Sequence, residues 1–462
     1  MLSLVKAASL IVPLVSLVVY QAANKPSFIS LPCALVRFDC PSHIPVHGFV
    51  DDDYKEVYDL FVDNIKQGHE VGASLAVYVD GKQVIGLQGG WQDVENKIEY
   101  TNNTLQMVFS STKVLVSAAI FIAQLVDQGL LSYDERIATY WPEFAQNNKE
   151  NVTLMDLMRH TAGVGALDTP LSLANVTDYA TFTKILAEQP HNFDGVPTHA
   201  YHAITQGWYQ NEIVRRVDPQ HRTIDDLARE LKDKYGSEWY LKPDATEGVD
   251  VGRIAPFYSR PSYQKLIGLA TAYLNPFTDK TFLKTVFDKN SLFTKTIIHP
   301  NIGQKKGIMN NRDPETRAIE GPSYSGHTNA DSMAKLAAMM ANRGKAIVEG
   351  EPDLFTKDST YRDATVFVAK EVDAVFPQIA IHNLRGGFMA FPNEDFFDLS
   401  DKEAQFVGGA GAGGSLFIWN EKYNIAFAYA MNGYNDRIDT DKRTKSVVKA
   451  VFEKVKKQKN LK

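Results

Sequence analysis

The chain has 462 residues, of which 44% are hydrophobic, and a formal net charge of −6 at pH 7. This length predicts two or three lobes with a sizeable core, and the composition is ordinary for a soluble globular protein. The acidic balance gives no general attraction to nucleic acid and the sequence has no motif of an RNA- or DNA-binding protein, so we expect no nucleic-acid partner.

Residues 1–24 are predicted to be a signal anchor or a signal peptide, followed by a linker over residues 25–50. Residues 7–20 are uncharged and mostly apolar, which fits a signal-peptide core or a short membrane anchor. The segment Gln21-Ala22-Ala23 makes a poor cleavage site, which favours an uncleaved anchor. Because the arginines of a mitochondrial presequence are missing, we expect the secretory pathway, with the protein membrane-anchored or secreted.

The two cysteines, Cys33 and Cys40, lie just beyond the apolar segment. In an oxidising compartment they can pair across a short loop, and elsewhere they would be two unreactive thiols. Asn-x-Ser/Thr sequons at Asn102, Asn151 and Asn175 agree with a glycoprotein on a secretory route.

A helix and a hairpin open the body of the chain. Apolar residues at helical spacing predict a helix over residues 51–66. Residues 73–79 and 83–87 are typical of two strands joined by the turn Asp80-Gly81. A long apolar helix over residues 114–131 is expected next.

Helical patterns dominate the middle of the chain to about residue 300. A short helix capped by Thr153 is expected to end near Gly163. Longer helices are predicted over residues 204–217, 224–235 and 330–342. The end of the chain reverts to strands over residues 415–419 and 425–431, then to a helix over residues 444–457.

Strands at both ends with helices between them predict an α+β fold, an α/β sandwich. One antiparallel sheet would be formed from both chain ends with flanking helices, and a mainly helical lobe would be inserted. We expect the α/β lobe to comprise about residues 51–112 and 320–460, and the helical lobe about residues 113–319. The seam between the two lobes is a favoured place for a pocket.

The strongest chemical signal is Ser110-Ser111-Thr112-Lys113, at the start of the long apolar helix. The three-residue spacing puts hydroxyl and amine on one helical face, and the helix N-terminus adds unpaired N–H groups. A serine nucleophile with a lysine base needs this arrangement. The spacing alone is weak evidence, because it recurs at four positions, beginning at Ser3, Ser262, Ser332 and Ser446. At Ser110 the match follows a strand-like segment and opens a long, strongly apolar helix, where a buried Lys113 needs a partner or a function.

Tyr201-His202-Ala203, ahead of the helix over residues 204–217, supplies a second candidate. An adjacent ammonium favours phenolate, so a lysine nearby is expected to lower the pKa of Tyr201 from its usual value of about 10. On its own, Tyr201 would be a packing residue at the edge of a helix.

The glycines of residues 409–414 match the G-x-G-x-x-G spelling of a dinucleotide site. A strand follows them where such a site needs a helix, so we expect no dinucleotide cofactor. We predict a glycine-rich edge strand whose backbone approaches a ligand closely. The pairs His43/His47 and His199/His202 lack further metal ligands, so we expect structural histidines and no metal.

These motifs resemble the serine β-lactamase and penicillin-binding-protein superfamily, in its class C-like, esterase-like branch. The resemblance runs from about Val57 to Phe452, and residues 51–460 would be the β-lactamase-like domain. Its motifs are Ser110-x-x-Lys113, an "LLxHTSG"-like segment ending in His160-Thr161-Ala162-Gly163, Tyr201-His202-Ala203 in the region of Tyr-x-Asn, and residues 411–415 at the end of the Lys/His-Thr-Gly strand.

The resemblance implies that Ser110 attacks an ester or amide carbonyl and that water hydrolyses the acyl-enzyme. Lys113 and Tyr201 would share proton transfer, with the identity of the general base left open. The oxyanion hole would use the N–H of Ser110 and one from the strand at Gly411 and Ala412. No cofactor is implied. The partner would be a small-molecule or peptide ester or amide, and the oligomeric state is unknown.

Two positions depart from the family pattern. Gly409 stands where the family has a Lys or His that binds a substrate carboxylate, and Ala203 stands in place of an Asn that orients the substrate. These departures predict an ester, peptide or lipid-derived substrate in preference to a carboxylate-bearing β-lactam. They also leave open an alternative, a catalytically reduced or inactive β-lactamase-like protein that serves as a binding protein or scaffold.

Overall fold

The computed structural model describes residues 43–115, 120–262, 288–298, 311–377, 379–435 and 442–459, together with positions 28, 33, 40, 264, 265 and 285. Within these residues no helix is long and apolar enough to cross a membrane. The predicted signal segment, residues 1–24, lies outside them. The predicted division into linker and lobes stays a prediction.

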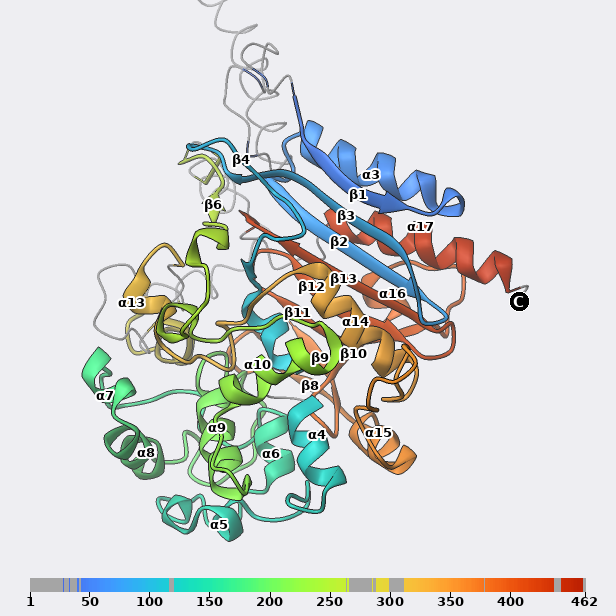
Figure 1. Cartoon of the computed structure of the whole chain (residues 1–462). Coiled ribbons are helices and arrows are strands. Elements are labelled where there is room, and N and C mark those ends of the chain that lie inside the picture. The colour runs from blue at the N-terminus through green and yellow to red at the C-terminus, as the bar shows by residue number, and fades with distance from the viewer. Residues whose placement is uncertain are drawn as a thin grey trace, which may run out of the picture.

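A sheet of antiparallel strands forms the centre of the molecule (Figure 1). Its strand order is β1-β3-β2-β13-β12-β11-β10-β9-β8, and β4 pairs with β3. The strands are β1 (Val46–Val50), β2 (Gly72–Val79), β3 (Lys82–Asp93), β4 (Ile98–Glu99), β8 (Phe367–Val372), β9 (Ala380–Leu384), β10 (Met389–Pro392), β11 (Gln405–Gly411), β12 (Ser415–Asn420) and β13 (Ile425–Met431). Because β13 lies between β2 and β12, the predicted single sheet built from both chain ends is confirmed.

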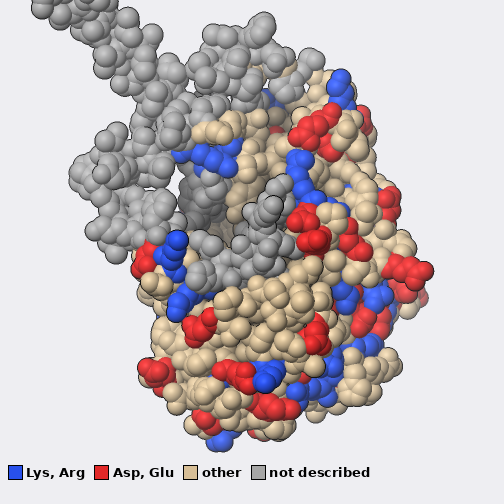
Figure 2. Space-filling model, turned by 90° about the vertical axis from the view of Figure 1, so that its left-hand side faces the viewer, with Lys and Arg blue, Asp and Glu red and all other residues tan. Residues whose placement is uncertain are grey.

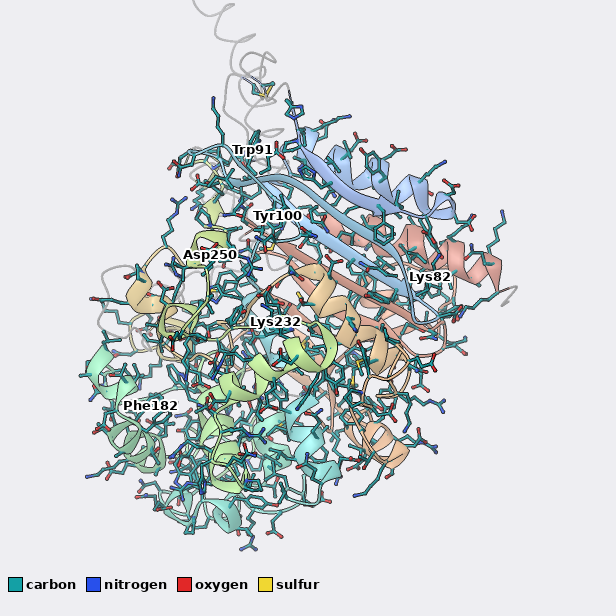
Figure 3. All side chains as sticks on the ribbon, in the orientation of Figure 1. Lys82, Trp91, Tyr100, Phe182, Lys232 and Asp250 are labelled. Carbon is teal, nitrogen blue, oxygen red and sulfur yellow. A yellow bond between two sulfur atoms is a disulfide. The ribbon has the colours of Figure 1, made fainter. Side chains whose placement is uncertain are left out.

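The predicted hairpin of β2 and β3 is confirmed. Asp80 and Gly81 have φ values of 51° and 77°, and a two-residue turn with positive φ matches the twist of the strands that it joins. Lys82 is the first residue of β3 and lies at the end of the sheet where this hairpin turns (Figure 3). The edge strand β1 was not predicted, because its three middle residues are exposed and show no apolar alternation.

Each face of the sheet packs against helices, because successive strand residues point to opposite faces. Leu75 and Val77 belong to the core under α3 (Lys55–Lys66) and α17 (Lys442–Gln458), which lie on the same side of the sheet in Figure 1. Ala76 between them belongs to the opposite core, which includes α14 (Ala330–Ala341). This arrangement confirms the α+β fold class.

The remaining helices are α4 (Ile120–Asp127), α5 (Ile137–Tyr140), α6 (Leu154–Met158), α7 (Leu173–Thr177), α8 (Tyr179–Glu188), α9 (Thr205–Val217), α10 (Ile224–Tyr235), α13 (Pro314–Arg317), α15 (Asp358–Ala364) and α16 (Asn393–Phe396). The four longer predicted helices, now α9, α10, α14 and α17, begin and end close to the predicted residues. Two predicted helices end early: α4 stops at Asp127, and α6 stops at Met158 because His160 has a φ of 64°.

The glycine-rich strand is not an edge strand, contrary to the prediction. β11 pairs with β12 on one side and with β10 on the other. The sequence analysis missed β8, β9 and β10, which are four to six residues long and carry no regular apolar alternation. Since β10 reaches only as far as Gly408, the last three residues of β11 pair with β12 alone.

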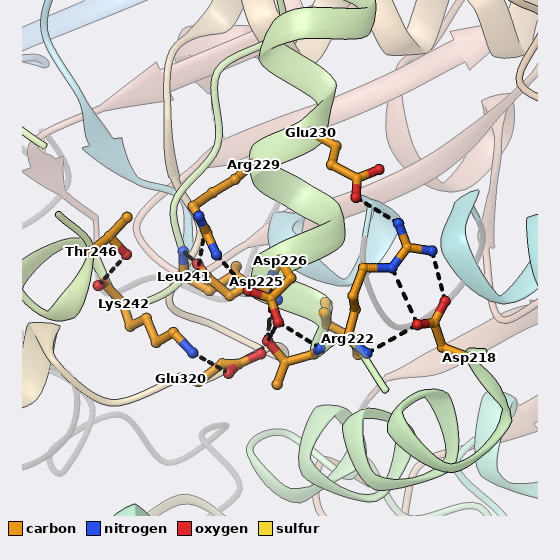
Figure 4. Close-up of polar contacts among 12 residues, drawn as sticks. Asp218, Arg222, Asp225, Asp226, Arg229, Glu230, Leu241, Lys242, Thr246 and Glu320 are labelled. Carbon is orange, nitrogen blue, oxygen red and sulfur yellow. Dashed lines mark hydrogen bonds and ion pairs between the residues drawn. The ribbon is translucent and has the colours of Figure 1, made fainter. Parts of the chain in front are cut away.

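Ion pairs fix the helical region around α10 (Figure 4). Arg222 contacts Asp218 at 2.7 Å and Glu230 at 2.6 Å. The carboxylate of Glu320, in turn, accepts from Lys242 Nζ at 3.0 Å and from the Asp225 N–H at 2.9 Å. Glu320 is therefore anchored to α10 three residues before the chain reaches the site described below.

Charged side chains of both signs are interspersed on the surface that Figure 2 shows. A disulfide joins Cys33 to Cys40, seven residues later in the chain (Figure 3). The pairing of the two cysteines across a short loop, one of the two predicted states, is therefore the state observed.

Candidate active site

Ser110 lies in η2 (Phe109–Ser111), a single 3₁₀ turn that Val108 connects to the short strand β5 (Gln106–Met107). Pairing of β5 with β7 (His327–Thr328) fixes the chain before the turn. Ser110 is partly exposed, whereas the three residues that follow it, through Lys113, are buried. The hydroxyl of Ser110 is thus the accessible group of the Ser-x-x-Lys sequence.

Phe109 holds the backbone of this turn in an unusual conformation. Its φ is 45°, in the left-handed region that bulky side chains rarely adopt and that persists only where the surroundings enforce it. The Phe109 ring stacks on Phe257 with centroids 4.6 Å apart and meets Tyr434 edge-on at 5.6 Å. This aromatic packing stabilises the turn that presents Ser110.

A pair of buried serines ties the turn to β12. Ser415 Oγ donates to the Val108 carbonyl at 2.7 Å, so its single proton is used there. In the 2.9 Å contact between Ser111 Oγ and Ser415 Oγ, Ser111 must therefore be the donor. The nucleophile turn is bonded to a strand more than 300 residues later in the chain.

Lys113 Nζ donates to two backbone carbonyls, Ala203 O at 2.6 Å and Ser323 O at 2.9 Å. Burial lowers the pKa of Lys113 well below its usual value of 10.5, because the charged form is poorly solvated there. A neutral amine has two N–H donors and one lone pair. The two carbonyls match the two donors, so the lone pair stays available to accept a proton.

Gly207 of α9 allows Ser323 to reach Lys113. A Cβ at Gly207 would lie 2.5 Å from Ser323 N and 2.7 Å from Pro322 C, so only glycine lets the two segments approach this closely. The Gly207 N–H also donates to Ser323 Oγ at 2.7 Å.

Tyr201 is in direct contact with Ser110. Its hydroxyl donates to Ser110 Oγ at 2.7 Å, and Lys113 Nζ lies 5.0 Å from the centroid of its ring. Burial raises the pKa of Tyr201 to about 12, and the charge of Asp373 acts in the same direction. The predicted lowering of this pKa is therefore wrong, because burial of the phenol is the largest cause of its shift and acts in the opposite direction.

The end of β11 lies against the nucleophile turn. A Cβ at Gly411 would lie 2.2 Å from Val108 O and 3.0 Å from Ser111 N. The Gly414 N–H donates to Gly411 O at 3.1 Å, and in a trans peptide the N–H of the next residue, Ala412, points the opposite way. The structure thus brings Gly411, followed by Ala412, to the turn of Ser110, and the oxyanion role of these two residues stays a prediction.

Gly409 has no room for a side chain on this strand. A Cβ there would lie 2.6 Å from Val114 Cγ2. The apolar side chain of Val114 stands where a substituent at position 409 would have to begin.

Among the described residues, no group of three or more His, Cys, Asp or Glu side chains could hold a metal ion, so neither of the predicted histidine pairs belongs to such a group. His47 Nε2 contacts Glu99 at 2.8 Å on the surface. His199 Nδ1 lies 3.1 Å from Asp373 Oδ2 in the interior.

The structure brings together Ser110, Lys113 and Tyr201, with Gly411 and Ala412 beside them. The sequence analysis missed Ser323, Val114 and Asp373. Ser323 acts through its carbonyl, which no side-chain motif reveals, and Asp373 is a single acidic residue far from the other positions.

Comparison with known proteins bears on the same region. A model of the beta-lactamase family matches residues 57–450, most of the chain. The chain belongs to the beta-lactamase family. The family segment contains Ser110, Lys113, Tyr201 and the glycine-rich strand, so the resemblance drawn from these motifs is confirmed.

Other members of the beta-lactamase family are similar to this chain. The esterase/beta-lactamase LipL of Mycobacterium tuberculosis (strain ATCC 25618 / H37Rv) is 30% identical over 208 residues, 45% of each protein. The match thus spans about half the length of that relative. Among solved structures, a family VIII carboxylesterase has a TM-score of 0.70 at 25% identity, over 89% of this chain and 100% of the other. A penicillin-binding-protein homologue from Caulobacter crescentus has a TM-score of 0.69 at 26% identity, with the same coverage.

Proposed function

We propose that this beta-lactamase family member is a serine hydrolase that acts on an ester or amide substrate through an acyl-enzyme at Ser110. The observation that carries the proposal is the 2.7 Å contact between Tyr201 Oη and Ser110 Oγ, beside a buried lysine whose pKa is lowered. An idle binding site would not require a buried amine and phenol beside a partly exposed serine, so the alternative of an inactive scaffold is not favoured.

Tyr201 and Lys113 form the proton-transfer pair in this proposal. As the serine attacks the carbonyl, the two hydroxyls exchange donor and acceptor roles: the proton of Ser110 Oγ moves to Tyr201 Oη, and the phenol proton moves to the neutral amine of Lys113. When the tetrahedral intermediate collapses, the pair returns one proton to the leaving group. Water then attacks the acyl-enzyme by the same route in reverse, which frees the acid and restores Ser110.

The N–H groups of Ser110 and Ala412 are the proposed oxyanion hole. The close approach of Gly411 to the turn of Ser110 supports the pairing of these two donors. Two N–H groups directed at the developing oxyanion stabilise the tetrahedral intermediate more than the substrate.

The substrate we propose is neutral near its carbonyl. Val114 fills the space beside Gly409, so the group that would bind a substrate carboxylate is replaced by an apolar one, and Ala203 offers no amide to orient the substrate. The half-buried rings of Phe257 and Tyr434 pack on Phe109, the residue before Ser110, and suit an apolar acyl or alcohol group. Two similar proteins, a family VIII carboxylesterase and the esterase/beta-lactamase LipL, support ester hydrolysis.

A fluorophosphonate probe tests the nucleophile. We expect it to label the wild-type protein once, with the adduct mapped to Ser110 by mass spectrometry, and to leave Ser110→Ala unlabelled. Ser111→Ala is the control at the neighbouring serine, which is fully buried and bonded to Ser415. Equal labelling of wild type and Ser110→Ala would rule the proposal out.

We further propose a secretory route, with the protein glycosylated and membrane-anchored or secreted. The Cys33–Cys40 disulfide supports an oxidising compartment. Two of the sequon asparagines, Asn102 and Asn151, are exposed. A mass shift on treatment with peptide N-glycosidase, lost in Asn102→Gln/Asn151→Gln, is expected, and a protein made in its own host that shows no shift would contradict glycosylation at these sites.

A further inference from the structure

The carboxylate of Asp373 accepts a hydrogen bond from the backbone of Tyr201, whereas Ser110 and Lys113 contact the Tyr201 side chain. It follows β8 and is 1% exposed. Its Oδ2 accepts from the Tyr201 N–H at 3.0 Å, while its Oδ1 accepts from the N–H groups of Val375 and Phe376 at 2.7 and 2.8 Å. One buried carboxylate therefore joins two chain segments that lie more than 170 residues apart.

The same two segments are joined a second time through His199. Its Nδ1 lies 3.1 Å from Asp373 Oδ2, and its carbonyl accepts from the Ala374 N–H at 2.9 Å. The Tyr201 segment thus donates to Asp373, and the segment of Asp373 donates back to the His199 carbonyl. A shift of the Tyr201 backbone would therefore break the turn at Asp373.

The Tyr201 ring is held as well. The ring of His160 meets it edge-on with centroids 4.8 Å apart, and Phe376 lies 6.4 Å from it on the segment that Asp373 orders. His160 is itself fixed to the backbone beside Tyr201, because its carbonyl accepts from the Ala200 N–H at 3.0 Å. The phenol is thus aimed at Ser110 by a scaffold in which Asp373 is the shared acceptor.

We propose that Asp373 is a positioning residue for the reaction: its buried carboxylate accepts from the Tyr201 N–H and fixes the phenol beside Ser110. This inference rests on the proposed hydrolase function. Catalysis depends on geometry at this scale, since a displacement of about 1 Å can cost about 10²-fold in rate.

The charge of Asp373 also bears on the titration of the phenol. After burial, the charge of Asp373 is a further cause that raises the pKa of Tyr201, while the hydrogen bond with Ser110 lowers it. Among the described residues, the other titratable groups near Tyr201 are Lys113 and His160, which contact its ring, and His199 and His202, whose rings contact His160. Burial lowers the pKa of both His160 and His202, so these two are neutral at neutral pH and leave Asp373 as the local negative charge.

Asp373→Asn is the main test, because the amide keeps the shape and removes the charge. We expect kcat for a neutral ester to fall about 10- to 100-fold with KM little changed, and the alkaline limb of the kcat profile to move to lower pH. A purely structural role would lower activity without moving the limb. Asp127→Asn is the matched control: Asp127 is also a buried carboxylate that accepts from backbone N–H groups, those of Thr356 and Lys357, and we expect lower stability with unchanged kcat and pH profile.

A readout that needs no turnover separates this inference from the proposed function. In protein labelled with 3-fluorotyrosine, the ¹⁹F resonance of Tyr201 is the one missing from Tyr201→Phe. We expect it to titrate at lower pH in Asp373→Asn than in wild type, even if no ester is hydrolysed. An unchanged titration together with wild-type kcat would overturn the inference, whereas absence of fluorophosphonate labelling in the wild type would overturn only the hydrolase.

Asp373→Glu keeps the test decisive if Asp373→Asn does not fold. It retains the charge but moves the carboxylate by one methylene, so we expect a lowered kcat with the alkaline limb near its wild-type position. A wild-type kcat in Asp373→Glu would contradict the positioning role.

Discussion

Lys113 is the residue whose charge state decides what the site can do. It is buried, it donates to two carbonyls, and burial alone accounts for its lowered pKa. The protonated form has three donors for two acceptors, and in that form it cannot take up a proton. Activity is therefore expected to depend on the neutral amine.

Replacing Lys113 by methionine tests this at the residue scale. We expect kcat/KM to fall about 10²- to 10⁴-fold because the proton acceptor is lost. In the wild type, activity should decline as pH falls through the lowered lysine pKa, since protonation removes the lone pair. Steady-state pH profiles measure this, and an activity that rises on acidification would contradict the assignment.

Lys149 provides the matched control for a buried lysine. Its Nζ donates to the carbonyls of Gln146 and Ala187, and burial lowers its pKa to about 8, but it lies outside the site. Lys149→Met should alter stability and leave kcat unchanged. Because the folded pKa is below the unfolded value, the unfolded state binds more protons between about pH 8 and 10.5, so this lysine makes the wild type gain stability with rising pH in that window.

The residues of the site differ in how well the sequence predicts them. Ser110 and Lys113 are three positions apart at a helix start, so local geometry alone brings them to one face. Tyr201 could be selected only through its family motif. Asp373 and Ser323 escaped prediction because their contacts, with the Tyr201 N–H and with Lys113 Nζ, are made by the tertiary fold.

The decisive element is the last part of β11, where the strand meets the nucleophile turn. Gly409 to Gly411 pair with β12 only, and Gly411 lies against Val108 and Ser111. The glycine-rich pattern of this strand could be recognised in the sequence. Its position inside the sheet could not be predicted, because the short strands β8 to β10 are stabilised by pairing with neighbours rather than by their own apolar pattern.

Gly411→Ala tests this approach at the element scale. The new Cβ would lie 2.2 Å from Val108 O and 2.3 Å from Ser415 Oγ, so β11 and the turn must separate. We expect a loss of about 1–3 kcal/mol of folding free energy, as for other overpacked positions, and at least about a 100-fold lower kcat. Denaturant unfolding and esterase assays measure the two effects.

Gly252→Ala is the control for this substitution. Gly252 is exposed, and the nearest atom to a new Cβ is the side chain of Asp250 at 3.1 Å. It should retain stability within about 0.5 kcal/mol and full activity. If Gly411→Ala keeps its stability and activity as Gly252→Ala does, β11 has room for a Cβ at position 411, which would contradict the close approach.

At the scale of the whole molecule, a buried ion pair joins the two ends of the described chain. Arg443 Nη1 of α17 contacts Glu70 Oε2 just before β2, and both side chains are almost fully buried. Arg443 also donates to the carbonyls of Gly433 and Gly413. The last helix is therefore bonded to the loop that follows the glycine-rich strand.

Arg443→Met should be strongly destabilising, by about 3–5 kcal/mol, because Glu70 would be left as a buried charge without its guanidinium. Arg343→Met is the comparison: its pair with Glu421 is exposed, so we expect about 0–1 kcal/mol. Urea unfolding of both variants checks the difference, and Glu70→Gln/Arg443→Met should recover part of the loss. Equal effects in the two single variants would contradict this account.

The central place of β13 in the sheet also has a consequence for biosynthesis. Val79 of β2 pairs with Ile425 of β13, so about 350 residues leave the ribosome between the two partners. At about 5–20 residues per second, the edge of the first hairpin waits roughly 20–70 s before it is covered. During that interval the nascent chain exposes a strand edge open to aggregation, and a polypeptide released before Ser415 lacks the hydrogen bond that holds the nucleophile turn at Val108.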